Sequence, residues 1–194
     1  MNLLSFSLVY LIPISVFLGY WMGGVYTFLT PFFIFIVVPL TDMIIGTDTR
    51  NPGPDEQADL DRQKAYRWLT WGCMPLQLAV VGAGAYIIGR GGLSLLEFAG
   101  LTVSVGMSSG ILGINVAHEL THRVNEKFEP YLSRIMLCTV FYNHWGQEHV
   151  VGHHRWVATP HDPATARLGE SFYRFWPRTV LAGLRVPGNS RKTG

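Results

Sequence analysis

Residues 93–122, LSLLEFAGLTVSVGMSSGILGINVAHELTH, form a long apolar run that ends in two histidines. The part from Leu93 to Ala117 carries one acidic residue, Glu97, near its start, and it is rich in glycine and serine. About 20 apolar residues cross the hydrocarbon core of a bilayer, and small residues let membrane helices approach closely. The run therefore predicts a membrane helix with His118 and His122 at its end.

Three more apolar runs precede this one, at Leu3–Gly19, Val25–Ile45 and Trp68–Gly89. The whole chain is 48% hydrophobic and 14% charged, whereas soluble domains are roughly 25% charged. The first run lacks the basic start and the small-residue cleavage site of a signal peptide, so we interpret it as a membrane helix. The linkers 22–24 and 90–92 leave room only for tight turns. Together these features predict a lipid-embedded protein.

The runs pair into an expected architecture. We predict an all-α integral membrane helical bundle with about four transmembrane helices and a cytoplasmic, histidine-rich helical cap. One domain, 1–194, would divide into a helical hairpin at 1–45, a cytoplasmic loop at 46–67, a second hairpin at 68–117, a histidine-rich part at 118–185 and a tail at 186–194. Of the fifteen Lys and Arg residues, only Arg90 then lies on the other side of the membrane. The positive-inside rule makes the richer side cytoplasmic.

Smaller elements are predicted between and after the runs. The charged loop is expected to lead into a short surface helix, and Tyr131–Phe141 is an amphipathic stretch too short to span. Asp162 followed by Pro163 has the pattern of a helix N-cap, which predicts a helix running through Arg167 to Phe175. Cys73 and Cys138 lie in apolar stretches, so we expect reduced packing residues without a disulfide framework.

Histidine spacing indicates a metal centre. On an α-helix, residues four apart lie on one face, and this spacing occurs twice, in His118/His122 and His149/His153. His154 is turned about 100° from His153, toward a neighbouring metal position. Five imidazoles exceed the need of one tetrahedral zinc site and match two metals, for which iron is a suitable candidate.

The histidines also allow interpretations other than a two-metal centre. Residues 118–122, HELTH, also fit the H-E-x-x-H pattern of zinc proteases, in which Glu119 would be the general base. That intramembrane protease would leave His149, His153 and His154 without a role. A non-enzymatic protein that stores or senses metal is a third possibility. We interpret His144 and His161 as structural histidines.

Three segments carry a family resemblance: NVAHELTHR (115–123), EHVVGHH (148–154) and RWVATPHDPATARLGESFYRF (155–175). This combination resembles bacterial alkane 1-monooxygenases, within the membrane fatty-acid desaturase and hydroxylase group of di-iron enzymes. The loop residues Asp42, Gly46, Asp48, Asn51 and Pro52 are also similar, and the likeness extends from about Phe33 to Arg185. The string ATPHDPATARLGES is specific to alkane hydroxylases; a fatty-acid desaturase or an aromatic-methyl hydroxylase remains the alternative within the group.

The resemblance implies terminal hydroxylation of n-alkanes to primary alcohols with O2 at a non-haem di-iron centre in the bacterial inner membrane. Electrons would come from rubredoxin, reduced by an NADH-dependent reductase; no nucleic-acid partner is expected. The implied metal ligands are His118, His122, His149, His153 and His154. Imidazole ligands usually need a hydrogen-bond partner on their other ring nitrogen, and the candidates are Glu119, Glu148, Asp162 and Glu170. Helix capping is the competing role for Asp162.

Two further expectations follow from the resemblance. A position that limits the depth of the substrate channel in this family falls near Ile34, although a lipid-facing side chain is the competing interpretation. The family continues past the matched region with two more membrane helices and further histidine segments that these 194 residues do not contain. We therefore expect an N-terminal fragment with an incomplete site that is inactive as a hydroxylase on its own.

Overall fold

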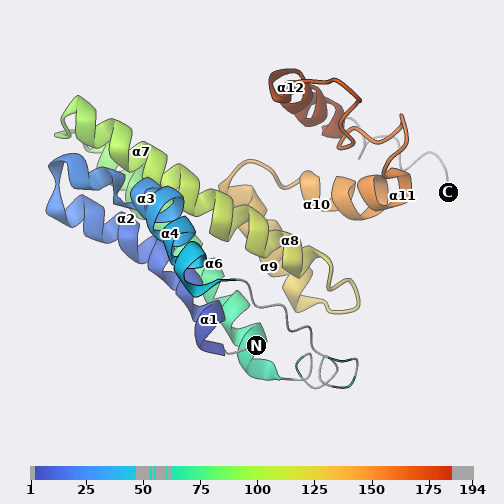
Figure 1. The fold of residues 1–194 in the computed structure, drawn as a ribbon, viewed down its shortest axis with the longest axis horizontal. Helices are drawn as coiled ribbons and strands as arrows, with labels where there is room; N and C mark the ends of the chain where they lie inside the picture. The colour runs from blue at the N-terminus through green and yellow to red at the C-terminus, as the bar shows by residue number, and fades with distance from the viewer. Residues whose placement is uncertain (1–2, 47–52, 54, 56–59, 61–62, 185–194) are drawn as a thin grey trace. The chain divides into compact units, whose positions relative to one another are not determined.

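The computed structural model describes residues 3–46, 53, 55, 60 and 63–184, and every regular element within them is a helix (Figure 1). The chain forms two compact units, Met1–Val116 and Ala117–Gly194. The all-α expectation is therefore confirmed. The expectations for Asp48, Asn51, Pro52 and the tail at 186–194, and most of the surface helix expected before residue 63, lie outside the described residues.

Four helical segments are long and apolar enough to cross a membrane, and the protein is a multi-pass membrane protein. They are Leu3–Met22, Gly24–Ile45, Lys64–Gly89 and Leu95–Thr121. The first comprises α1 (Leu3–Ser7), η1 (Leu8–Tyr10) and α2 (Leu11–Met22), and the second comprises η2 (Gly24–Phe28), α3 (Leu29–Phe32), η3 (Phe33–Val37) and α4 (Val38–Ile45). The third is α6 (Lys64–Gly89), and the fourth comprises α7 (Leu95–Ser109), η4 (Gly110–Val116) and α8 (Ala117–Thr121).

Small residues of α7 allow the close packing of the first unit. A Cβ atom on Gly100 would collide with Thr27 Oγ1 and with the ring of Phe28. One turn later, Ser104 Oγ donates a 2.6 Å hydrogen bond to the carbonyl of Thr27. The glycine and serine content of this run thus lets η2 lie directly against α7, as expected for helices packed in lipid.

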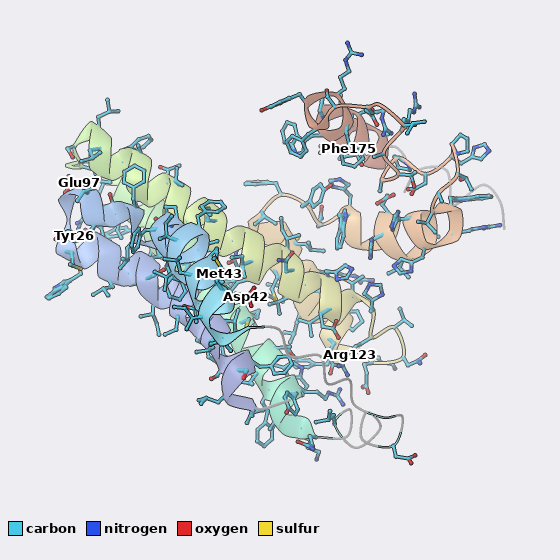
Figure 2. All side chains as sticks on the ribbon, viewed as in Figure 1. Tyr26, Asp42, Met43, Glu97, Arg123 and Phe175 are labelled. Carbon is cyan, nitrogen blue, oxygen red and sulfur yellow. The ribbon has the colours of Figure 1, made fainter. Side chains whose placement is uncertain are left out.

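Glu97, the acidic residue near the start of the fourth run, has two structural roles. Its carboxylate and Ser94 form a capping box at the start of α7. Glu97 Oε1 also accepts a 2.9 Å hydrogen bond from the amide of Gly24, in the turn between the first two spans. Gly23 and Gly24 have φ of 72° and 55°, a region that favours glycine. Figure 2 shows Glu97 and Tyr26 at the same end of the first unit.

The second unit contains α8, α9 (Phe128–Thr139), α10 (Trp145–Gln147), η5 (Glu148–His153), α11 (His154–Trp156) and α12 (Phe172–Gly183). The amphipathic stretch predicted at 131–141 lies largely in α9. Ser133 Oγ on α9 donates a 2.8 Å hydrogen bond to the carbonyl of Ala117, which fixes α9 against α8. Leu120 of α8 and Met136 of α9 are both fully buried. The helix that begins the histidine-rich part is therefore held by a packed partner.

Two local predictions are wrong. Residues 163–171 form turns, and the helix begins at Phe172. Asp162 does accept the amide hydrogen of Ala164 at 2.9 Å, but this is an Asx turn, an alternative to helix initiation that short polar side chains favour. Cys138 is a free cysteine as expected, but it is exposed and therefore not a packing residue; Cys73 is free and buried.

Candidate metal centre

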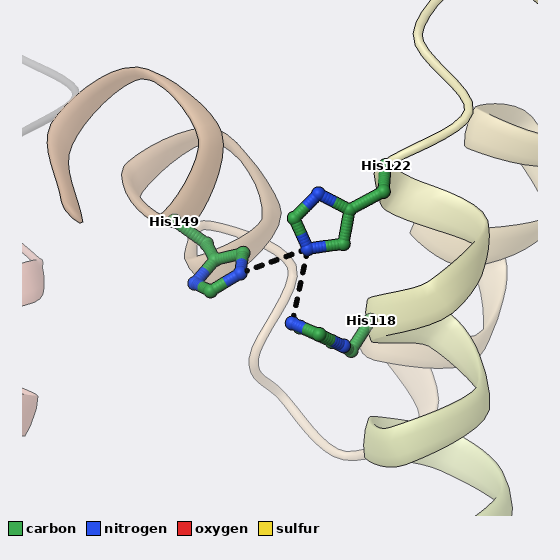
Figure 3. A group of neighbouring side chains, drawn as sticks. All are labelled: His118, His122 and His149. Atoms are coloured by element: carbon green, nitrogen blue, oxygen red, sulfur yellow. Dashed lines mark hydrogen bonds between the residues drawn. The ribbon is translucent and has the colours of Figure 1, made fainter. Parts of the chain in front are cut away.

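Five of the seven histidines lie in two segments of the second unit. His118 lies in α8 and His122 directly follows it, while His149 and His153 lie in η5 and His154 begins α11. Three of them, His118, His122 and His149, place one ligand atom each within 4.8 Å of one another (Figure 3). The structure thus brings together residues that are about thirty positions apart in sequence.

The Nε2 atoms of four histidines form a continuous row. His118 and His122 Nε2 are 3.0 Å apart, His122 and His149 Nε2 are 3.2 Å apart, and His149 and His154 Nε2 are 3.1 Å apart. Two imidazole nitrogens that each lie about 2.1 Å from one metal, at an angle near 90°, are about 3.0 Å apart. The spacing of the first three members of the row, His118, His122 and His149, therefore fits a shared metal ion.

Hydrogen bonding alone cannot satisfy this row. A neutral imidazole Nε2 carries either one hydrogen or one lone pair. His122 and His149 each contact two other Nε2 atoms, so at most two of the three contacts in the row can be hydrogen bonds at one time. A metal ion resolves this conflict because every nitrogen can direct its lone pair toward the ion.

The π-helical turn of η5 decides which histidines meet. An α-helix would place His149 and His153 on one face, as the sequence predicts, but a π-helix repeats its backbone hydrogen bonds at i→i+5. His149 therefore shares the row with His154, five residues later, rather than with His153. The ring of His153 stacks on that of His149 at 5.4 Å between centroids, and its Nδ1 donates a 2.9 Å hydrogen bond to Asp162 Oδ2.

Burial keeps two of the clustered imidazoles, His122 and His149, neutral. Desolvation, followed by the charges of the neighbouring histidines, lowers the pKa of His149 to about 4. Desolvation also lowers the pKa of His122, with further contributions from His118 and His154. A group whose charged form is disfavoured in this way remains unprotonated at pH 7. Neutral imidazole is the form that binds a metal.

The four predicted carboxylate partners have different surroundings. Asp162 is buried and contacts His153, as described above. Glu148 is also buried, and burial followed by the charge of Asp162 raises its pKa. Within the described residues its Oε1 has no hydrogen-bond partner. Glu119 and Glu170 lie instead at 3.6 Å and 2.7 Å from the guanidinium groups of Arg123 and Arg178.

The remaining predicted positions lie outside the row. His144 packs against Tyr142 and His161 packs against Trp156, at 4.8 Å and 5.7 Å between ring centroids. Ile34 lies half-buried in η3 of the first unit. A groove of about 550 Å³ in that unit is lined by neighbours of Ile34, including Phe33, but Ile34 itself is not among its lining residues.

Two residues near the site, Trp145 and Arg178, are not among those predicted from the sequence. Trp145 stacks on His149 at 4.4 Å between centroids, with an interplanar angle of 18°. Its spacing of four residues before His149 is the one signal that could have identified it. Arg178 binds Glu170 and two backbone carbonyls, and nothing in the sequence pattern singles it out from the other arginines.

Comparison with known proteins identifies a family and a group of related enzymes. The family model for fatty acid desaturase matches residues 93–192, which include all five clustered histidines. Alkane 1-monooxygenase of Acinetobacter baylyi is 38% identical over 80% of this chain and 38% of its own length. The alkane 1-monooxygenases of Pseudomonas putida and Ectopseudomonas oleovorans are 38% and 36% identical, over 77% and 87% of this chain.

The chain covers 37% of the length of the Pseudomonas putida relative and 43% of that of the Ectopseudomonas oleovorans relative. The chain thus spans well under half the length of these relatives. The desaturase match, by contrast, covers more than half of the chain itself. The chain belongs to the fatty acid desaturase family and is a homologue of alkane 1-monooxygenases.

Proposed function

We propose that the protein hydroxylates n-alkanes at the terminal methyl group to give primary alcohols, using O2 at a non-haem di-iron centre. The observation that carries the proposal is the row of four Nε2 atoms, because its spacing fits a metal and its contacts cannot all be hydrogen bonds. Homology to alkane 1-monooxygenases supports the choice of substrate and of iron.

The histidines divide into two groups in this proposal. His118, His122 and His149 would bind one iron through Nε2, since their ligand atoms lie within 4.8 Å of one another. His154, at the far end of the row, would reach the neighbouring metal position. His153 would present its Nε2 to the second iron, because Asp162 accepts the hydrogen of its Nδ1 and thereby fixes the ring tautomer. When bound, the two irons supply the activation of O2 that an unreactive methyl group requires.

The proposed reaction also needs electrons and a defined location. Conversion of an alkane and O2 to an alcohol and water consumes two electrons and two protons, and we propose rubredoxin, reduced by an NADH-dependent reductase, as the electron donor. The proposed location is the bacterial inner membrane, with the histidines on the cytoplasmic side. The distribution of Lys and Arg in the sequence supports this orientation.

Metal identity and Glu119→Gln together test the proposal. Glu119 is 57% exposed and pairs with Arg123, so we expect Glu119→Gln to retain bound iron and most of the activity. A general base contributes about 10²–10⁴-fold to a rate, and a zinc protease would lose activity on that scale. Because these 194 residues are expected to be inactive on their own, the activity tests use them joined to the C-terminal part of a homologous alkane 1-monooxygenase. Membranes containing this completed protein, supplied with NADH, rubredoxin and its reductase, should convert octane to 1-octanol. Zinc in place of iron, or an alkene as the product, would contradict the proposal.

Ile34→Trp tests the proposed substrate channel. If Ile34 limits the channel, an indole ring at this position should shorten the longest alkane that is accepted. The measurement is the product profile with n-alkanes of increasing length, analysed by gas chromatography. Phe35→Trp is the control, since Phe35 is the next residue in η3 and is 66% exposed. An unchanged profile in Ile34→Trp would mean that this side chain faces lipid.

A further inference from the structure

Arg178 of α12 binds three acceptors in the segment that precedes its helix. Its Nε and Nη2 each donate a 2.7 Å hydrogen bond to one oxygen of the Glu170 carboxylate. Nη1 donates to the carbonyl of Pro163 and Nη2 to the carbonyl of Thr165, both at 3.0 Å. The guanidinium therefore joins both ends of the turn-forming segment 163–170 to α12.

The carbonyls that Arg178 binds belong to residues that directly follow Asp162, whose carboxylate contacts His153. Asp162 Oδ2 accepts from His153 Nδ1 and from the hydroxyl of Thr165. Thr165 Oγ1 in turn accepts a 2.9 Å hydrogen bond from the amide of Ala158. Residues 163–171 form no helix, so helical backbone hydrogen bonds do not fix them. Two backbone hydrogen bonds, from the amide of Asp162 to the carbonyl of Thr159 and from the amide of Thr165 to the carbonyl of Asp162, form the turn, and the side-chain contacts add to them.

We propose that Arg178 is a positioning residue: by holding the backbone of residues 163–165, it keeps Asp162 against His153 and fixes the direction of the His153 ring. Arginine suits this role because its planar guanidinium group can donate hydrogen bonds to several acceptors at once, whereas the ammonium group of lysine is a compact point charge. The consequence for metal binding rests on the proposed di-iron centre. The positioning itself does not, since all of its contacts are between protein atoms.

The test is NMR of the metal-free chain in detergent, with ¹⁵N-labelled histidine and the His153 signal assigned by its loss in His153→Gln. In the parent chain we expect His153 to show one tautomer, with a slowly exchanging hydrogen on Nδ1. Arg178→Gln should mix the tautomers and accelerate exchange of that hydrogen by about 10-fold or more, the scale on which removed supporting contacts act. Arg178→Lys should behave in the same way although it keeps the charge.

Arg174→Gln is the matched control, because Arg174 lies one turn earlier in α12 and is exposed. It should leave the His153 signal unchanged. An unchanged His153 signal in both Arg178 variants would overturn the proposal. An equal disturbance of all histidine signals with loss of helical circular dichroism would also overturn it, because Arg178 would then serve folding in general.

Metal titration of the same variants separates this inference from the proposed function. With Co²⁺ as the probe, Arg178→Gln should lower the affinity of the His153-dependent site about 10-fold, while the site of His118, His122 and His149 is retained. If His153 is disordered by Arg178→Gln but the parent chain binds no metal, the positioning role stands and the proposed metal centre fails. If metal binds but His153 is unaffected by Arg178→Gln, the positioning role alone fails.

Discussion

His149→Ala is expected to lower the affinity of the chain for Fe²⁺ by more than about 100-fold, beyond the 10–100-fold that is lost with a supporting residue. His149 Nε2 lies in the middle of the row, at 3.2 Å from His122 and 3.1 Å from His154. Removal of the His149 imidazole separates His154 from His118 and His122. The measurement is anaerobic titration of the detergent-purified chain against a chelator that competes for the metal.

Two further variants make this experiment specific. His118→Ala removes an end of the row, where Nε2 contacts His122 alone, so its effect should be smaller than that of His149→Ala. His144→Ala removes a histidine outside the row and should leave the affinity unchanged. Equal losses in His149→Ala and His144→Ala would mean that the row is not the metal site.

Gly100→Leu is expected to destabilise the first unit by about 1–3 kcal/mol or more, the usual cost of overfilling a packed contact. Any Cβ at this position collides with Thr27 and Phe28, so η2 and α7 must separate. This separation would also break the hydrogen bond from Ser104 to the Thr27 carbonyl. Thermal unfolding in detergent, followed by circular dichroism, measures the loss.

Gly106→Leu is the control for this variant. Gly106 lies in the same helix, and a Cβ there would meet no atom within 4 Å. Because leucine is a better helix former than glycine, Gly106→Leu should be neutral or slightly stabilising. A similar loss in both variants would assign the effect to glycine replacement in α7 rather than to its contact with η2.

The membrane fold was predictable because the apolar runs are long and the linkers between them are short. Composition and length alone identify four spans, and the glycines at 23 and 24 mark the first turn. The role of Glu97 was not predictable in this way. Its contact with Gly24 joins residues that are far apart in sequence, and no local pattern reports such a pairing.

The site was predictable in its residue types and less so in its geometry. Spacing and resemblance identified the histidines that cluster, and Asp162 was among the expected carboxylate partners. The competing capping role led to a helix predicted to begin at Pro163, whereas the helix begins at Phe172, because an aspartate before proline suits an Asx turn equally well. Trp145 and Arg178 act through tertiary contacts, which local sequence patterns do not encode.

The π-helical turn at η5 makes the length of this segment a determinant of how many metals the proposed centre can hold. Deleting Val151 would shorten the spacing between the first and last histidines of 148–154 from five residues to four, the repeat of an ordinary α-helix. The backbone could then relax to α-helical winding and still bring these two imidazoles together. His153 would rotate relative to Asp162, so a single deletion could convert a two-metal arrangement into a mononuclear site.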